Sequence, residues 1–209
     1  MMTAMLHVRA TVCGFAELST YCDAGVSHVL SILDPGSPVP AEFDSFGKHQ
    51  RLELRFHDVI EDVPDMVAPR TEDIRSLLAP GQQLTTSQSA ELHLLIHCHA
   101  GFSRSPAALV LLLAQARPSL PAEALASEIL RIRPNVWPNL RVIELGGRML
   151  HRRGDLVEAA SWIYRYRLEQ DPGLADMIIA NGRAREVDAG RTRKGMPPLN
   201  RSTAALLRT

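Results

Sequence analysis

The sequence predicts an α/β fold with a central, mostly parallel sheet flanked by helices and followed by a C-terminal helical extension. Short segments typical of strands alternate with helical patterns along the first 150 residues. One of them, 92–97, is apolar and bounded by polar residues, as in a strand buried on both faces of a parallel sheet. The length of 209 residues suits one such domain with an extension.

Four strands are expected, at 6–12, 26–33, 51–57 and 92–97. A short helix over 16–24 should end at Gly25, a residue suited to a left-handed C-terminal cap. The segment that begins Asp34-Pro-Gly-Ser-Pro is rich in turn formers and is predicted to be a loop. A helix should begin at Thr71 and run to 78, with an exposed polar loop over 80–89.

The helix predicted over 105–117 is apolar around most of its circumference, so it should lie at the centre of the core, with Pro106 in its first turn. Helices at 121–132 and 139–151 complete a predicted catalytic domain over 1–152. Beyond it we expect a helical extension over 153–190 and a disordered tail over 191–209. Three aromatic residues of the extension are expected to pack it onto the domain: Trp162, Tyr164 and Tyr166.

The charge is balanced, with 23 basic and 23 acidic side chains, which excludes a strongly basic nucleic-acid-binding protein. Residues 1–150 carry 12 basic and 16 acidic side chains, and residues 151–209 carry 11 and 7. The basic excess of the second part is expected to face solvent, with an acidic partner or a nucleic acid as alternatives. Its residues include Arg183, Arg185, Arg191, Arg193 and Lys194.

Three cysteines, at positions 13, 22 and 98, do not suggest a disulfide framework and favour a reduced, cytoplasmic setting. Cys13 and Cys22 are expected to be small buried side chains. The N-terminus has no pattern of a signal peptide, and the longest apolar run, 106–114, is much shorter than the ~20 residues of a membrane span. We therefore expect a soluble protein with no membrane partner.

The segment Leu95-Ile-His-Cys-His-Ala-Gly-Phe-Ser-Arg-Ser-Pro joins a buried strand to an apolar helix. Residues 98–104 form its loop, here called the signature loop. A loop that runs into a helix N-terminus turns backbone N–H groups inward and forms an anion cradle of phosphate size. Gly101 allows the loop to turn tightly, and Arg104 can bind two phosphate oxygens with its planar guanidinium.

Cys98 is expected at the floor of this cradle, where the helix dipole and Arg104 favour its thiolate form and make it a nucleophile. A cysteine followed six residues later by arginine is weak evidence by itself. Neither Cys13 nor Cys22 has an arginine at that spacing. Around Cys98, however, the preceding His97, Gly101 and the hydroxyl of Ser105 all agree with the same interpretation.

This string resembles the signature of the cysteine-based protein tyrosine phosphatase superfamily, His-Cys-x-x-Gly-x-x-Arg followed by Ser or Thr. The stretch Arg131-Ile-Arg-Pro-Asn-Val-Trp-Pro-Asn is similar to the segment that follows the loop in compact dual-specificity phosphatases. The likeness covers about residues 6 to 151. Because the Trp-Pro-Asp loop of the larger tyrosine-specific domains is missing, the compact, bacterial-type branch is favoured.

The resemblance implies a two-step reaction in which Cys98 forms a phosphocysteine intermediate that water hydrolyses, with no metal or cofactor. Ser105 would stabilise the departing thiolate, while His97 and Asn139 would support the site without touching substrate. The phosphate oxygens would be bound by the backbone or side chains of His99, Ala100, Gly101, Phe102, Ser103 and Arg104.

In related compact phosphatases the general acid is an Asp that ends the strand one helix before the signature. Asp58 occupies that place by register, and Asp62 and Asp65 follow in the same loop as alternatives. The spacing of forty residues from Asp58 to Cys98 is longer than expected, and the polar segment 80–89 is expected to absorb the excess.

The substrate implied is a phosphomonoester, first of all phosphotyrosine on proteins, with phosphoserine, phosphothreonine and small phosphomonoesters left open. The signature loop has no lysine, which disfavours polyphosphorylated inositol lipids. A phosphate-binding module without turnover is the competing class, and sulfur transfer or arsenate reduction is a second alternative. A zinc cluster of His93, His97, Cys98 and His99 is disfavoured, because neighbouring residues of a strand face opposite ways. The oligomeric state stays open.

Overall fold

In the computed structural model, which describes residues 8–86 and 92–192, four strands form one sheet. The strands are β1 (Val8–Cys13), β2 (His28–Leu33), β3 (Gln50–Arg55) and β4 (Leu92–His97). Their order is β1-β4-β2-β3, and each neighbouring pair is parallel. The predicted α/β class is confirmed.

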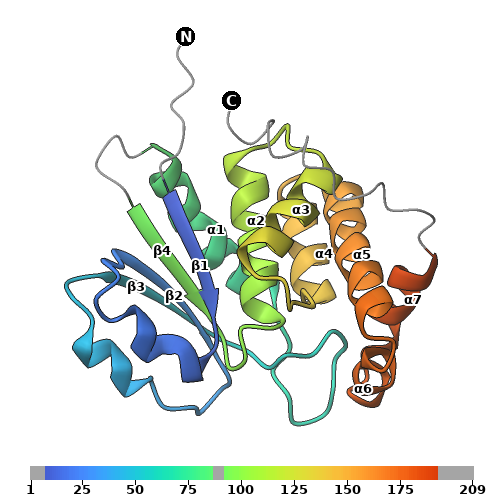
Figure 1. Ribbon diagram of the computed structural model, residues 1–209, viewed down its shortest axis with the longest axis horizontal. Coiled ribbons are helices and arrows are strands. Elements are labelled where there is room, and N and C mark those ends of the chain that lie inside the picture. Colours follow the sequence, from blue (N-terminus) through green and yellow to red (C-terminus); the bar gives the residue numbers. More distant parts are fainter. Residues whose placement is uncertain (1–7, 87–91, 193–209) are drawn as a thin grey trace.

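Helices α1 to α7 lie together on one side of the sheet, and two short 3-10 helices lie on the other (Figure 1). The 3-10 helices are η1 (Phe15–Tyr21) and η2 (Ala41–Ser45). The α-helices are α1 (Thr71–Thr86), α2 (Arg104–Ala116), α3 (Ala122–Ile132), α4 (Leu140–Met149), α5 (Arg153–Gln170), α6 (Leu174–Ala180) and α7 (Ala184–Thr192).

Two hydrophobic cores follow from the alternation of side chains along the strands. In β4, Leu94 and Ile96 face the α-helices and belong to the large core, whereas Leu95 faces η1 and η2 and belongs to the small one. The apolar helix α2 crosses the large core, with Val110 and Leu111 fully buried. The strand is thus covered on both faces, as its uninterrupted apolar sequence predicts.

Several element boundaries differ from the prediction. The helix that begins at Thr71 continues through Pro80 to Thr86, so most of the predicted loop over 80–89 is helical, and residues 87–91 lie outside the described ranges. Three α1 side chains that precede Pro80 pack in the large core: Ile74, Leu77 and Leu78. The helix predicted over 16–24 is the 3-10 helix η1 followed by a turn that ends at Gly25, whose φ is +67°.

The C-terminal region differs in a second way. The helical extension predicted over 153–190 is divided into α5, α6 and α7, and α7 includes Arg191 and Thr192. These two residues were assigned to a disordered tail, which is wrong for them, because a helix that buries Val187 and Gly190 against α5 continues to Thr192. Residues 193–209, with Arg193 and Lys194, lie outside the described part of the chain.

The helices after residue 152 pack into the same large core as the sheet. Helix α5 contacts α3, α4 and α7, and its fully buried Tyr164 stacks on Trp137 with ring centroids 4.6 Å apart. The Tyr164 hydroxyl donates a hydrogen bond to the Pro138 carbonyl. Trp162 and Tyr166 are partly buried against the same core. The segment that follows the signature loop is thereby packed against the C-terminal helices.

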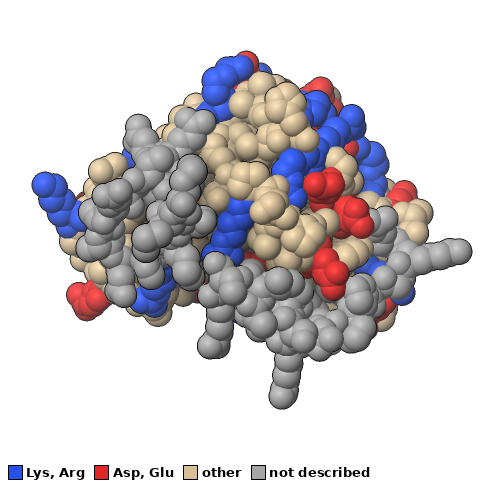
Figure 2. Space-filling view, turned by 90° about the horizontal axis from the view of Figure 1, so that it is seen from above, with Lys and Arg blue, Asp and Glu red and all other residues tan. Residues whose placement is uncertain are grey.

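The outer surface carries mixed charge. Figure 2 shows the face at the amino ends of the strands, where Lys and Arg side chains lie among Asp and Glu side chains. Within residues 8–86 and 92–192, no helix has both the length and the apolar character needed to cross a membrane.

Candidate active site

The signature loop lies at the carboxyl end of β4, next to the centre of the sheet. Cys98 follows the last residue of β4, and Arg104 is the first residue of α2. The Cys98 side chain is buried, and its Sγ lies 3.1 Å from the Ser105 Oγ. The helix dipole of α2 therefore points its positive end at the position of the sulfur.

The backbone carbonyls of the loop are bonded to the surrounding protein. The carbonyl of His99 accepts from the Phe15 N–H (2.9 Å), that of Phe102 from the Trp137 N–H (2.7 Å), and that of Ser103 from the Asn139 N–H (3.2 Å). The carbonyl of Ala100 accepts from Arg133 Nη2. Because C=O and N–H of a trans peptide point in opposite directions, the N–H groups of the same peptides point into the loop. The loop thus has the donor arrangement of an anion site.

Gly101 is required at its position in the loop. Its φ is +63°, and a Cβ at this position would come within 2.5 Å of the Cys13 backbone carbon. The backbone at Cys13 and Gly14 passes directly beneath the loop, since a Cβ on Gly14 would lie 2.8 Å from the carbonyl carbon of Ala100. Any side chain at either glycine would displace the loop.

Arg104 is buried, and the two sides of its guanidinium have different surroundings. Nη1 binds Asp34 Oδ1 at 2.5 Å and donates to the Phe56 carbonyl at 2.7 Å. Nε is buried and has no hydrogen-bond partner among the residues that the structure describes. The edge that carries Nε is therefore the one left for a bidentate contact with an anion, since an unpaired buried donor is unfavourable.

Asp34 was not identified from the sequence, where its segment was interpreted only as a loop. A signal for it exists, because Asp34 directly follows β2, and the carboxyl ends of parallel strands lie at the same edge of a sheet. Its carboxylate fixes the orientation of the Arg104 guanidinium.

His97 lies behind the cysteine. Its Nε2 is 2.6 Å from the Ser31 Oγ, and the ring is fully buried. Burial lowers the pKa of His97 from 6.5 to about 4, so the ring is neutral at neutral pH. This placement agrees with a supporting role that involves no contact with substrate.

Asp58 is the one of the three candidate acids that contacts the signature loop through a described hydrogen bond. Its Oδ1 accepts from Ser103 Oγ at 2.7 Å and from Asn139 Nδ2 at 2.8 Å. Asp62 instead pairs with Arg141 and is largely exposed, and Asp65 is exposed farther along the loop. Asn139 also begins α4, where its Oδ1 accepts from the Val142 N–H. The excess spacing between Asp58 and Cys98 is taken up largely by the extended α1.

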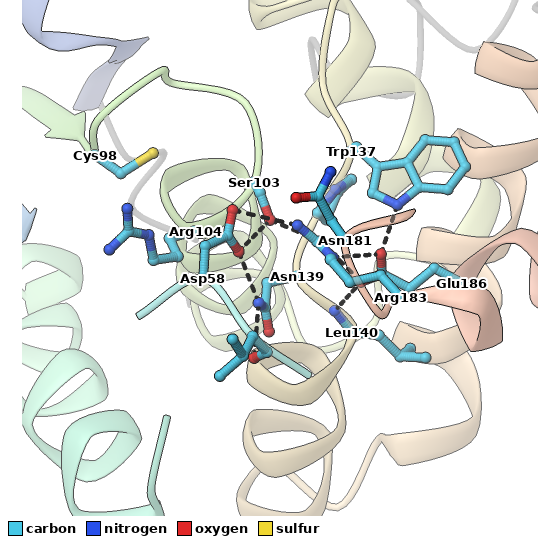
Figure 3. A network of polar contacts seen from close by, with 12 residues as sticks. Asp58, Cys98, Ser103, Arg104, Trp137, Asn139, Leu140, Asn181, Arg183 and Glu186 are labelled. Carbon is cyan, nitrogen blue, oxygen red and sulfur yellow. Dashed lines mark hydrogen bonds and ion pairs between the residues drawn. The ribbon is translucent and has the colours of Figure 1, made fainter. Parts of the chain in front are cut away.

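A second charged group approaches Asp58 from the C-terminal region. Arg183 Nη1 lies 3.2 Å from Asp58 Oδ2, and Nη2 donates to Ser103 Oγ at 2.8 Å. Figure 3 shows the carboxylate of Asp58 pointing towards Ser103, Asn139 and Arg183. Arg183 is only 5% exposed, so the expectation that it faces solvent is wrong. It pairs with two carboxylates, Asp58, which no sequence pattern connects with it, and Glu186, which stands three residues later in the chain.

The second carboxylate is Glu186, which is fully buried in α7. It accepts from Arg183 Nε (2.8 Å), from Trp137 Nε1 (2.6 Å) and from the Leu140 N–H (2.9 Å). Burial opposes the positive charge of Arg183, but Asp58 and Glu186 outweigh it and raise its pKa above the usual value. Arg183 is therefore charged at neutral pH.

Other basic residues of the C-terminal region are mostly at the surface. Arg185 is half exposed but pairs with Glu61 and Glu144, and Arg191 is exposed. The expectation of solvent exposure therefore holds for Arg191 and only in part for Arg185.

The remaining cysteines and histidines are distributed as follows. Cys13, Cys22 and Cys98 are free thiols. Cys13 is buried, and burial raises its pKa to about 12, whereas Cys22 is only partly buried, contrary to expectation. His93 contacts Thr11 and the Ala24 carbonyl. Over the described ranges, no three His, Cys, Asp or Glu side chains are grouped so that they could hold a metal ion.

No known family model matches the sequence, and no curated protein does. Among solved structures, the chain is similar to the crystal structure of Tk-PTP in the active form, at 21% identity, with 69% of this chain and 92% of that chain covered and a TM-score of 0.48. It is also similar to the crystal structure of PTPMT1 in complex with PI(5)P, at 16% identity, with 70% and 92% covered and a TM-score of 0.48. The function is therefore inferred from the geometry of the site itself.

Proposed function

We propose that this protein is a cysteine-dependent phosphatase of the compact dual-specificity type, which hydrolyses phosphomonoesters through a phosphocysteine intermediate. The observation that carries the proposal is the signature loop: its carbonyls are bonded outward, its N–H groups face inward, and they surround the buried Cys98 beside the open edge of Arg104. This combination of donors and nucleophile fits a tetrahedral phosphate ester.

In the first step the Cys98 thiolate attacks phosphorus, and the bond from phosphorus to the ester oxygen breaks. The loop N–H groups and Arg104 bind the three phosphoryl oxygens, whose charge the transition state spreads. Asp58 gives its proton to the departing oxygen. Its side chain is 31% exposed, so the carboxyl group is accessible to a bound ester.

In the second step a water molecule attacks the phosphocysteine, and Asp58, now a carboxylate, takes the proton of that water. The bond from phosphorus to sulfur breaks, and Cys98 leaves as a thiolate. The Ser105 hydroxyl, 3.1 Å from the sulfur, donates a hydrogen bond to the charge that forms there. Inorganic phosphate is released and the enzyme is restored.

Phosphotyrosine on proteins is the substrate that we favour, with phosphoserine and phosphothreonine next. The Arg104 edge and the loop donors recognise one phosphoryl group, and the loop side chains add no lysine for further phosphates. A small phosphomonoester is the alternative substrate class.

Hydrolysis of p-nitrophenyl phosphate tests the reaction. Wild-type protein should release p-nitrophenol and phosphate, and the Cys98→Ser variant should release neither while still binding phosphate. A phosphopeptide panel with wild type and a substrate-trapping Asp58→Ala variant then tests the substrate class. Equal turnover of phosphotyrosine and phosphothreonine peptides would reject strict tyrosine specificity.

A phosphate-binding module without turnover is the second candidate, because the same loop would bind phosphate without chemistry. Phosphate binding by a wild-type protein that hydrolyses no phosphomonoester would establish it and reject the enzyme. The presence of both Cys98 and a contacting carboxyl group at Asp58 favours the enzyme.

A further inference from the structure

The turn between α6 and α7 carries an arginine that joins three parts of the proposed site. Arg183 binds Glu186 through Nε and Nη2, Ser103 through Nη2 and Asp58 through Nη1. Ser103 belongs to the signature loop, and Asp58 lies near the start of the irregular segment 56–70 after β3. One guanidinium therefore connects the C-terminal helices to both loops (Figure 3).

The Ser103 hydroxyl extends this connection. It accepts from Arg183 Nη2 at 2.8 Å and donates to Asp58 Oδ1 at 2.7 Å. Asp58 Oδ1 thus receives the hydrogen bonds of Ser103 and Asn139, while Oδ2 faces Arg183. Regular secondary structure does not fix Asp58, because β3 ends at Arg55. Its orientation is set by these side-chain contacts.

A purely structural role would not need this arrangement. Glu186 already anchors α7 to the segment after the signature loop, through Trp137 Nε1 and the Leu140 N–H. The Nε and Nη2 edge of Arg183 is enough to pair with Glu186. The guanidinium nevertheless also binds Asp58 through Nη1 and Ser103 through Nη2. Burying this cation between two carboxylates is favourable only while all its donors are paired.

We propose that Arg183 is a positioning residue of the phosphatase site, which holds Asp58 against the signature loop in the orientation from which it transfers protons. The inference rests on the proposed function, since it assigns Arg183 to the general acid of that reaction. It also makes the helices α6 and α7 part of the catalytic unit.

Two esters with different leaving groups test the proposal. p-Nitrophenolate leaves readily without a proton, whereas phenolate needs one, so a misplaced Asp58 slows phenyl phosphate selectively. We expect Arg183→Met to lower kcat/KM for phenyl phosphate at least tenfold more than kcat/KM for p-nitrophenyl phosphate, because kcat/KM reports the first step, whereas hydrolysis of the phosphocysteine is common to both esters. An equal loss for both esters would mean that Arg183 is merely structural and would overturn the proposal.

Three further variants sharpen this comparison. In an Asp58→Asn background, Arg183→Met should leave the ratio of the two kcat/KM values unchanged, because Arg183 acts through Asp58. Arg183→Lys keeps the charge without the planar fork and should restore part of the ratio. Arg185→Met is the matched control: it removes the neighbouring ion pair with Glu61 in the same loop and should keep the wild-type ratio.

Thermal unfolding gives a readout that does not depend on turnover. The melting-temperature losses of Asp58→Asn and Arg183→Met should not add up in the double variant, because the two side chains interact. Additive losses would overturn the inference. If no Cys98-dependent hydrolysis of either ester is found, the proposed function fails, and the melting shifts alone decide whether Arg183 holds Asp58. Should Arg183→Met not fold, Arg183→Lys takes its place in both measurements.

Discussion

The hydroxyl of Ser105 lies 3.1 Å from the sulfur that must leave in the second step of the proposed reaction. A hydrogen bond to a charged group contributes about 1.5 to 3 kcal/mol, so we expect Ser105→Ala to lower kcat roughly 10- to 100-fold. The phosphocysteine should accumulate, and rapid-quench measurements should show a burst of p-nitrophenol. Ser105→Thr, which keeps the hydroxyl, should show little burst. An unchanged kcat in Ser105→Ala would contradict this role.

Arg104 is bound by Asp34 and the Phe56 carbonyl on one side and open on the other. A lysine has a single point charge and cannot serve both sides at once. We therefore expect Arg104→Lys to weaken inhibition by inorganic phosphate by about 10- to 100-fold, the loss of one charge-assisted hydrogen bond. Arg131→Lys, which changes a surface ion pair with Glu128, is the control. Inorganic phosphate should inhibit this variant as strongly as it inhibits wild type.

The part of the site that the sequence predicted is the part that is contiguous in the chain. Cys98, Gly101, Arg104 and Ser105 belong to one loop and one helix start, so their spacing alone brings them together. Asp34 and Arg183 reach the loop from β2 and from the end of α6, and only the sheet order and the docking of α7 place them there. Asp34 directly follows a strand, which is a positional signal, whereas Arg183 has no local signal for its contacts with Asp58 and Ser103.

Helices α2 and α4 approach closely at Gly146. A Cβ there would lie 2.3 Å and 2.4 Å from the two methyl groups of Leu111, which is fully buried and has no free space to move into. Alanine gains about 1 kcal/mol of helix propensity over glycine, but overpacking a core costs about 1 to 3 kcal/mol. We expect Gly146→Ala to lower the free energy of unfolding by about 1 kcal/mol, as measured by urea denaturation. Stabilisation would show that the two helices separate easily.

The strands and the central helix were predictable because the apolar residues of their sequences are the residues that the fold buries. Residues 92–97 form the predicted strand, and α2 begins one residue before the predicted start. Helix α1 was predicted to end at residue 78, because the polar segment 80–89 was interpreted as a loop, but it continues to Thr86. Most of helix α7 lies within the helical extension predicted over 153–190, but no hydrophobic pattern marked it as a separate helix, since its buried residues include Glu186.

For the whole molecule, the histidines whose pKa is lowered by burial make stability depend on pH. Burial lowers the pKa of His97 from 6.5 to about 4, and burial also lowers the pKa values of His28 and His93. Between pH 6.5 and about pH 4, the unfolded chain takes up a proton at His97 that the folded chain does not take up. The folded state is therefore fully stabilised above pH 6.5 and loses stability as the pH falls towards 4, by up to about 3 kcal/mol for His97.

Urea unfolding of wild type and His97→Gln at pH 7 and pH 4.5 tests this expectation. The wild-type protein should lose more free energy of unfolding between the two pH values than the variant does, because the variant has no imidazole to protonate at this position. Equal losses would show that His97 does not contribute to the acid sensitivity of the fold.

The contacts of Arg183 also bear on when activity appears during synthesis. A ribosome makes Arg183 about 85 residues after Cys98, roughly 4 to 17 s later at ordinary elongation rates. Until then a nascent chain carries the nucleophile and the phosphate-binding arginine without the group that holds Asp58. If the proposed function holds, a nascent chain should therefore hydrolyse esters with poor leaving groups slowly until α7 has emerged and docked.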